Sequence, residues 1–302
     1  ASSAVLTIDG GGNVTATSAT RTFVHGPPQP AAAYYHSLTP ARILDSRPGS
    51  LQVGPFGTPW GAGTQRNVEV AGFSGVPSDA VAVPLNLTVT GTTAGSFLQI
   101  WPKGQAIPSS SAINWSSGQT LANAVTVGVG ADESVTIRNQ TGNTNVLIDV
   151  VGYYDDDPVT GDSFTPVTPV RLVDSRPGTP TLQFDTKWGS AATRSVTVAG
   201  VAGSGVPLGA DAVVLNITAT GGSASSFLTV WPTGQPKPTA SSLNFSAGRS
   251  VPNAVTAKVG TNGKVEIFNS AGTVDVIVDV VGYFDLGVGD PFRPLPNPVR
   301  IQ

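Results

Sequence analysis

The sequence predicts an all-β protein: two tandem β-sandwich domains of Greek-key or jelly-roll type, with extended terminal strands. Three observations lead to this fold class. Turn-forming residues are abundant, with 36 Gly and 25 Pro in 302 residues. Apolar and polar residues alternate with period two in many short segments, whereas helical periodicity is nearly absent. Most of the chain also occurs twice, at a spacing long enough for a whole domain.

Four pairs of motifs carry the duplication. PARILDSRPGS at Pro40–Ser50 returns as PVRLVDSRPGT at Pro169–Thr179. The spacing is 129 residues from Arg42 to Arg171. A similar spacing separates the members of the other three pairs, which are VPLNLTVT with VVLNITAT, SFLQIWPKGQ with SFLTVWPTGQ, and LIDVVGYYD with VIVDVVGYFD. We therefore divide the chain into an N-terminal extension at 1–35, repeat 1 at 36–157, repeat 2 at 158–287 and a C-terminal strand at 288–302.

The clearest strand is Val83–Thr90, which places Val83, Leu85, Leu87 and Val89 on one face. Pro84 on the other face indicates that this strand lacks a neighbour on one side, although Val214 in repeat 2 weakens that indication. Turn signals separate the remaining strands, and each of these has a counterpart in repeat 2. In repeat 1 we expect them at Gln65–Val70, Phe97–Trp101, Ala122–Val129, Ser134–Asn139 and Val146–Tyr153.

The segment Asp155–Asp162, with the sequence DDDPVTGD, joins the repeats. It is short and acidic and contains proline, so we expect it to hold the repeats in an extended tandem. Its three neighbouring carboxylates are a pattern for Ca²⁺. The matching segment after repeat 2, DLGVGD, keeps only two acidic residues, which favours a solvated linker over a metal site.

Both ends of the chain resemble parts of a repeat. The segment Pro291–Gln302 resembles the opening of repeat 2, Ser163–Arg176, and stops where a third DSR would be due. Ala4–Ser18 indicates a hairpin around Gly10–Asn13 and echoes Ala254–Ser270, the last part of a repeat. We expect the chain to begin with the tail of one module and to finish with the head of another. Such ends have two explanations, strands exchanged between copies or a piece cut from a longer repeat protein, and both stay open.

Composition restricts the classes of function. The net charge is −3 and no basic stripe is present, which excludes nucleic acid as the expected partner. The absence of Cys excludes disulfides and thiolate metal sites, and no apolar run reaches the ~20 residues of a membrane span. The chain opens with Ala1, which indicates either a mature product whose leader has been removed or a trimmed chain. We expect an extracellular or cell-surface protein with no cofactor and no bound metal.

The order of these motifs, RLVDSRPG, GVP, VVLNITAT, VWPTG, SSLNF, PNAV and VIVDVVGYF, resembles a repeat module of secreted and surface proteins of actinobacteria and related bacteria. The resemblance covers Leu38–Tyr154 and Phe164–Phe284, about four fifths of the chain. It implies an extracellular, accessory, non-catalytic β module, and it supplies no catalytic residues.

Charged residues shared by both repeats form the first candidate site. Asp149 and Asp279 interrupt very apolar strands, so each carboxylate needs a partner. We expect Asp149 to pair with Arg42 or Arg47, and Asp279 with Arg171 or Arg176, tying the first strand of each repeat to the last. Asp45 and Asp174 lie two residues before Arg47 and Arg176, on the same strand face. A structural ion-pair network is favoured over an active site or a metal site.

Catalysis finds little support. The two histidines, His25 and His36, lie ahead of the first shared motif at Pro40 and have no counterpart in repeat 2, and no G-x-S-x-G elbow occurs. Four tryptophans, Trp60, Trp188, Trp101 and Trp231, form a second candidate site. Exposed rings would stack on sugars, whereas buried rings would close a sandwich core. The core is favoured for Trp101 and Trp231, and both alternatives stay open for the other two.

Two functions from different classes remain. The first is a non-enzymatic structural surface protein that associates with itself head-to-tail into a fibre. Its assembly strand would include Phe292, Pro298, Val299, Arg300 and Ile301, adding to the sheet of a neighbouring copy. The second is a carbohydrate-binding or adhesive pair of modules, whose partner would be a cell-wall or extracellular glycan.

Overall fold

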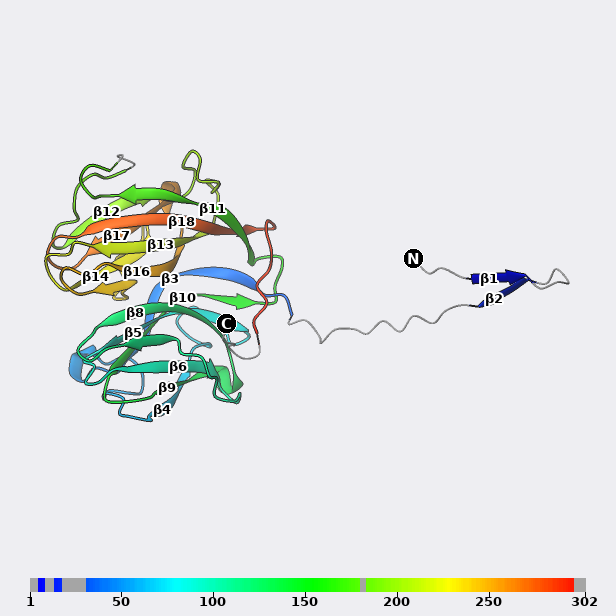
Figure 1. Cartoon of the computed structure of the whole chain (residues 1–302), viewed down its shortest axis with the longest axis horizontal. Coiled ribbons are helices and arrows are strands. Elements are labelled where there is room, and N and C mark those ends of the chain that lie inside the picture. The colour runs from blue at the N-terminus through cyan, green and yellow to red at the C-terminus, as the bar shows by residue number, and fades with distance from the viewer. Residues whose placement is uncertain (1–4, 9–13, 18–30, 180–182, 296–302) are drawn as a thin grey trace. The chain divides into compact units, whose positions relative to one another are not determined.

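A computed structural model describes residues 5–8, 14–17, 31–179 and 183–295 of the chain. Residues 31–302 belong to one compact unit, and the first 30 residues belong to another. The first unit contains a hairpin of β1 (Val5–Ile8) and β2 (Val14–Thr17), which pair antiparallel and form a sheet of their own. The second unit contains both repeats (Figure 1).

Each repeat consists of eight strands in the same order. The strands of repeat 1 are β3 (Tyr34–Asp45), β4 (Gln65–Glu69), β5 (Ala82–Thr90), β6 (Ser96–Pro102), β7 (Ile113–Trp115), β8 (Leu121–Gly128), β9 (Ser134–Asn139) and β10 (Asn145–Asp155). Those of repeat 2 are β11 (Asp162–Asp174), β12 (Ala192–Thr197), β13 (Ala212–Thr220), β14 (Ser226–Pro232), β15 (Leu243–Phe245), β16 (Val251–Lys258), β17 (Lys264–Asn269) and β18 (Asp275–Leu286). All the strands predicted for repeat 1 are present.

Each repeat is a sandwich of two four-strand layers, so the predicted all-β fold is confirmed. The outer layers are separate sheets of order β4-β9-β6-β7 and β12-β17-β14-β15. The inner layers join into one eight-stranded sheet, β16-β13-β18-β11-β3-β10-β5-β8, through the pairing of Asp162 with Tyr35. The expected extended tandem is therefore wrong. Because the first strands of the two repeats are neighbours in one sheet, the repeats lie side by side.

The alternation of apolar residues explains the core of each sandwich. Leu85, Leu87 and Val89 of β5 are at most 1% exposed and belong to the core of repeat 1. Leu215 and Ile217 of β13 take the same place in repeat 2. Burying each such side chain contributes roughly 1.5–3 kcal/mol. The opposite face of each inner layer carries the polar residues of the motif, and this face positions the candidate site.

Pro84 does not mark an edge, because β5 pairs with β10 on one side and with β8 on the other. The ladder to β10 is interrupted between the pairs Val150–Leu85 and Tyr154–Ala82, which leaves Pro84 without a β10 partner. In repeat 2, Val214 occupies the equivalent position and pairs with Gly282. Proline removes a ladder donor, and it is tolerated here because the β10 ladder is irregular at this point.

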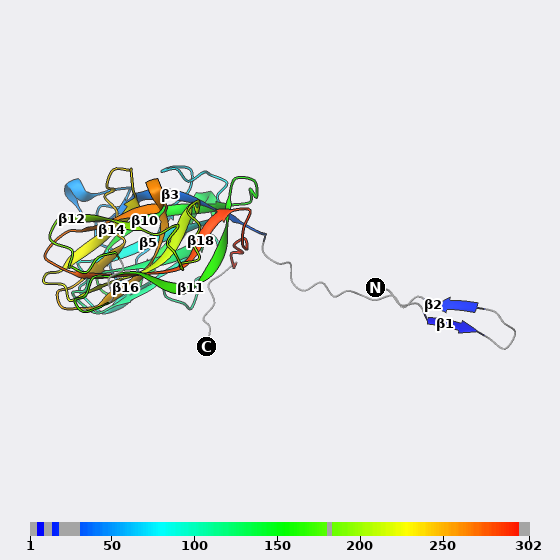
Figure 2. The ribbon, with the colours of Figure 1, turned by 90° about the horizontal axis from the view of Figure 1, so that it is seen from above.

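A glycine near the end of each last strand lies under an aromatic ring. A Cβ on Gly152 would collide with the ring of Tyr35, and one on Gly282 would collide with the ring of Phe164. The Tyr35 hydroxyl donates to the carbonyl of Val151 at 3.0 Å. The VGY and VGYF motifs are thus explained by close packing of the first strand on the last. Both views show β11 beside β18 (Figures 1 and 2).

No helix among the described residues has the length and apolarity needed to cross a membrane.

Candidate functional site between the two repeats

The shared charged residues of repeat 1 form a buried network between β3 and β10. Arg42 donates to Asp149 through Nε at 2.8 Å and through Nη2 at 3.0 Å. Its third nitrogen reaches Asp45 at 3.2 Å, and Arg47 also donates to Asp45. The side chains of Arg42 and Asp149 are 9% and 1% exposed. The expected pairing of the first strand with the last is present in this repeat.

Repeat 2 has the same contacts in a more open setting. Arg171 donates to Asp279 at 2.8 and 3.2 Å and to Asp174 at 3.0 Å, while Arg176 donates to Asp174 at 2.9 Å. Here the side chains of Arg171 and Asp279 are 43% and 20% exposed.

Hydrogen bonds and the charge of Arg176 lower the pKa of Asp174 to about 2. Burial alone would raise the pKa of Asp45, but the hydrogen bonds from Arg47 hold it below its usual value.

A loop of repeat 2 covers the network of repeat 1. This loop, Gln235–Ser242 between β14 and β15, places the N–H of Ser241 on Asp149 at 3.1 Å. The amide of Asn86 donates to the carbonyl of Ser241. Burial raises the pKa of the Asp149 carboxyl, and the donors from Arg42 and Ser241 oppose that rise. The carboxylate is therefore a bridge between repeats as well as within one.

Asn253 of β16 completes the contact. Its amide donates to Asn86 at 3.0 Å and to Ser242 at 2.7 Å, and its oxygen accepts from the N–H of Ala124 at 3.2 Å. Lys258 on the same strand donates to Ser37 of β3 at 3.3 Å. These contacts run in one direction, from the β14–β16 region of repeat 2 to the inner layer of repeat 1.

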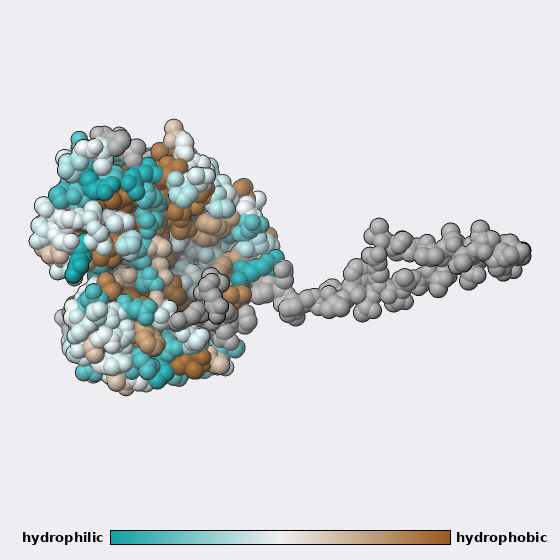
Figure 3. Space-filling model, in the orientation of Figure 1, coloured by the Kyte–Doolittle hydropathy of each residue, from teal (hydrophilic) through white to brown (hydrophobic). Residues whose placement is uncertain are grey.

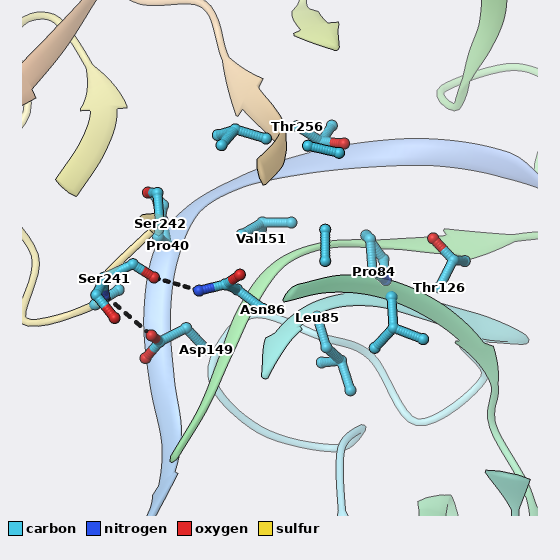
Figure 4. Close-up of a pocket in the computed structure, with 15 residues that line it drawn as sticks. Pro40, Pro84, Leu85, Asn86, Thr126, Asp149, Val151, Ser241, Ser242 and Thr256 are labelled. Carbon is cyan, nitrogen blue, oxygen red and sulfur yellow. Dashed lines mark hydrogen bonds between the residues drawn. The ribbon is translucent and has the colours of Figure 1, made fainter. Parts of the chain in front are cut away.

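A cavity of about 230 Å³ lies at this boundary. Its walls come from both repeats and are mainly apolar, while Asn86, Asp149 and Ser241 line one end (Figure 4). Those polar groups already bond to one another, as the dashed lines show. Apolar residues are also visible along the boundary in the space-filling view (Figure 3). The arrangement is suited to holding two surfaces together, and its carboxylate is not free to act as a base.

The tryptophans do not form a ligand surface, so this alternative is wrong. Trp60 and Trp188 are 0% exposed, and Trp101 and Trp231 are 3% and 4% exposed. Arg194 lies over the Trp188 ring at 4.4 Å, and Arg66 lies over Trp60 at 5.1 Å. A charged residue on the neighbouring strand thus covers each ring. That pairing is visible in the sequence, because Trp60 and Trp188 are each followed six residues later by an arginine.

The C-terminal assembly strand lies only partly within the described residues. Phe292 exchanges two backbone hydrogen bonds with Ala33 of its own chain, at 2.7 and 2.8 Å, and its ring lies 4.5 Å from that of Tyr154. The expectation that Phe292 is free for a neighbouring copy is therefore wrong. Pro298, Val299, Arg300 and Ile301 lie outside the described residues.

The acidic linker is used locally. Asp155 accepts from His36 at 2.9 Å, and Asp157 accepts from the N–H of Val159 and from the hydroxyl of Thr160, both at 2.8 Å. Within the described ranges, no group of three His, Cys, Asp or Glu residues is arranged to hold a metal ion. The linker carboxylates close a turn.

Sequence reasoning missed the aromatic residues at the junction of the repeats. Tyr35, Tyr154, Phe164 and Phe284 meet there, with the rings of Tyr35 and Phe284 only 4.3 Å apart. The available signal was the aromatic residue seven positions before both Arg42 and Arg171. It also missed Ser241 and Asn253. Each has an identical residue at the equivalent position of repeat 1, but only the residue in repeat 2 contacts the other repeat, so comparing the two repeats does not reveal the contact.

No protein-family model matches the chain, and no curated protein matches it. Solved structures resemble it weakly. The Penaeus vannamei nodavirus structure has 10% identity, covers 89% of this chain and 96% of its own, and gives a TM-score of 0.25. The tandem CBM22 domains of Paenibacillus barcinonensis Xyn10C have 9% identity, with 87% and 99% covered and a TM-score of 0.22. The PBSX exported protein XepA has 13% identity, with 92% and 98% covered and a TM-score of 0.24. Similarity at this level does not indicate a function.

Proposed function

We propose that this chain is a non-enzymatic structural protein of the cell exterior that associates with copies of itself head-to-tail. The observation that carries the proposal is the β1–β2 hairpin. It forms a two-stranded sheet in a unit separate from residues 31–302, and no other described strand pairs with it. A lone two-stranded hairpin is marginally stable in water. Its two edges present unpaired N–H and C=O groups, to which a strand from another molecule can add.

The C-terminal segment is the natural donor of that strand. Residues 290 and 292 already pair as extended backbone with residues 164 and 33. Leu295, the last residue described, is 62% exposed. The sequence that follows, Pro298–Ile301, repeats the Pro-Val-Arg of the first strand of repeat 2. If the hairpin of one copy accepts this strand from another, the contact joins different surfaces and builds an open chain of subunits.

The state of the charged residues supports a role without catalysis. Asp149, Asp279, Asp45 and Asp174 each accept hydrogen bonds from a guanidinium. The oxygens of such a carboxylate are occupied by charge-assisted hydrogen bonds, which supports a structural role for it. The location outside the cell rests on the resemblance of the motifs to secreted repeat modules. The carbohydrate-binding alternative loses its proposed residues, because all four tryptophans are buried.

The test compares three purified proteins by light scattering and negative-stain electron microscopy over a range of concentrations. The full chain is expected to form long assemblies. A chain lacking 291–302 is expected to stay as single subunits with both repeats folded. A chain lacking 296–302 keeps Phe292 in place and is expected to behave in the same way, which separates strand donation from damage at Ala33. Filaments that persist in both truncated chains would overturn the mechanism.

A further inference from the structure

Three segments of the chain occupy equivalent positions at the junction of the repeats. Each begins two residues before an aromatic residue: Ala33 before Tyr35, Asp162 before Phe164, and Asp290 before Phe292. The first two segments open repeat 1 and repeat 2. The third shares Asp-x-Phe-x-Pro with the second, and Pro-Val-Arg follows at 298–300, one residue later in the segment than Pro-Val-Arg at 169–171. We call these segments head 1, head 2 and head 3.

The three heads pair with one another in a cycle. Tyr35 of head 1 pairs with Asp162 of head 2. Phe164 of head 2 pairs with Asp290 of head 3. Phe292 of head 3 pairs with Ala33 of head 1. In each case the aromatic position of one head faces the first position of the next. A closed cycle of equivalent contacts is the property of a three-fold axis.

The aromatic rings follow the same rule. The ring of Tyr35 in head 1 lies 4.3 Å from Phe284, the last aromatic residue of repeat 2. The ring of Phe292 in head 3 lies 4.5 Å from Tyr154, the equivalent residue of repeat 1. Within each repeat, the head ring lies 5.2 Å from the last aromatic ring, for Tyr35 with Tyr154 and for Phe164 with Phe284. Head 3 lies on repeat 1 as head 1 lies on repeat 2.

The strands that head 1 and head 3 contact are also equivalent in the two repeats. Head 1 contacts β16 of repeat 2, where Lys258 donates to Ser37. Head 3 and β8 of repeat 1 line one cavity of about 370 Å³, with Phe292 and Leu295 on one side and Thr126 and Gly128 on the other. Since β8 and β16 are equivalent strands, head 3 takes the same place on repeat 1 that head 1 takes on repeat 2.

The surfaces that a third repeat would cover are the ones left open. On repeat 2, the Arg171 and Asp279 side chains are 43% and 20% exposed, whereas Arg42 and Asp149 under the Ser241 loop are 9% and 1% exposed. On repeat 1, Asn123 is exposed, whereas its equivalent Asn253 is 4% exposed. Both asparagines hold the loop of their own repeat, and Asn253 alone also reaches the other repeat.

We propose that the open face of repeat 2 and the Asn123 side of repeat 1 form the seat of a third β-sandwich repeat of the same kind. Its first strand starts at Asp290, and its equivalent of Ser241 bonds to Asp279 and Asn216. Asn123 of repeat 1 bonds to the equivalent of Asn86 in the third repeat. The three repeats then form a ring around the aromatic cluster.

A second intact copy of the chain does not fit this seat. In a three-membered ring, the repeat that follows the third position falls on the first. If repeat 1 of a second copy took the seat, its own repeat 2 would overlap the first repeat of the host. The seat therefore fits a single repeat. A C-terminal strand that opens a third repeat is not free to join the hairpin of another copy, so the two proposed contacts exclude each other for any one strand.

The test supplies that repeat within one chain. Residues 1–300 are followed directly by residues 172–302, so that Arg300 takes the place of Arg171 and the added sequence is that of repeat 2. The chain holds no cysteine, which allows a single designed pair to report contact. The test pair is Asn216→Cys with Ser241→Cys in the added repeat. The matched control, in the two-repeat chain, is Asn86→Cys with Ser241→Cys.

Under mild oxidation in dilute solution, both pairs are expected to lose their free thiols to the same extent, as measured by intact mass. Small-angle scattering is expected to give a compact particle for the three-repeat chain. A control pair that closes beside a test pair that stays reduced would overturn the proposal. So would an added repeat that folds at a distance or stays unfolded. Self-association is measured on the chain that lacks the added repeat. The proposal of head-to-tail assembly and the proposal of a seat for a third repeat can therefore fail independently.

Discussion

The same four charged residues occupy two environments in this protein. In repeat 1, Arg42 and Asp149 are covered by Ser241, Asn86 and Asn253. In repeat 2, Arg171 and Asp279 make the same bonds to each other but face solvent. The motif therefore serves each sandwich in the same way, by tying its first strand to its last. Its second use, binding the loop of another repeat, is realised only in repeat 1.

The comparison has a direct energetic meaning. An exposed ion pair contributes little, typically about 0–1 kcal/mol, because water competes for both charges. Removing one partner of a buried pair is far more costly, because the remaining charge stays desolvated. Identical substitutions in the two repeats should therefore have unequal effects, and each such pair of variants can confirm or break the comparison.

The largest difference is expected for the carboxylates. Asp149→Ala leaves the buried Arg42 with only its bond to Asp45 and the Ser241 N–H without an acceptor, so the free energy of unfolding should fall by about 3–5 kcal/mol. Asp279→Ala should lower it by about 1 kcal/mol or less, since Arg171 is solvated. Urea denaturation of both variants measures the difference. Equal losses would contradict the assigned burial.

The next difference concerns the asparagines at the same register. Asn86→Ala removes a donor to Ser241 and an acceptor for Asn253 in a buried site, with an expected loss of about 1–3 kcal/mol. The matched variant Asn216→Ala changes a half-buried residue outside that contact and should cost about 0.5 kcal/mol or less. The same urea measurement applies, and a larger loss for Asn216→Ala would count against the direction of the contact.

A smaller effect is expected at the aromatic cluster. Phe292→Ala removes a ring that lies against Tyr154 at 4.5 Å, and the expected loss is about 1–2 kcal/mol. Phe292→Tyr keeps the ring and serves as the control. Hydrogen exchange near Ala33 should rise in the alanine variant, because that residue shares two backbone bonds with residue 292. Unchanged exchange there would show that the bridge between head 1 and head 3 does not form.

The smallest effect concerns a single proton at the start of repeat 2. Burial and the neighbouring Asp211 and Asp285 raise the pKa of Asp162 to about 7, with Lys258 opposing. An unfolded Asp titrates near 3.9. The folded state therefore holds this proton between about pH 4 and 7, and its contribution to stability is lost as the pH rises through that window. Asp162→Asn should flatten the profile, and an unchanged slope would refute the protonation. Repeat 1 has Ala33 at this position and no such group.

The sequence predicted the strands and the ion pairs because each leaves a local pattern. Alternation in Val83–Thr90 defines the buried face of β5, and a carboxylate inside an apolar strand, as at Asp149, requires a cation. The Gly-rich loops around Trp60 and Trp188 left the burial of these rings open. The sequence signal lay outside the loops, in the arginine six residues after each tryptophan, which covers the ring from a neighbouring strand.

The arrangement of the repeats could not be predicted for a different reason. Asn86 and Asn216 are the same residue in the same motif, yet only Asn86 contacts the other repeat. Two copies that contact through different surfaces must use some shared residues once only. Residues shared by the two repeats indicate what each sandwich needs to fold. They do not indicate a contact that one repeat makes and the other does not.

The central claim is that repeat 2 covers the polar face of repeat 1 in one direction only. Hydrogen exchange at two equivalent serine amides tests it most directly. The N–H of Ser241 donates to buried Asp149 and should exchange only when the repeats separate or unfold. The N–H of Ser111, its half-buried equivalent in repeat 1, should exchange orders of magnitude faster. Equal exchange at the two amides would contradict the account.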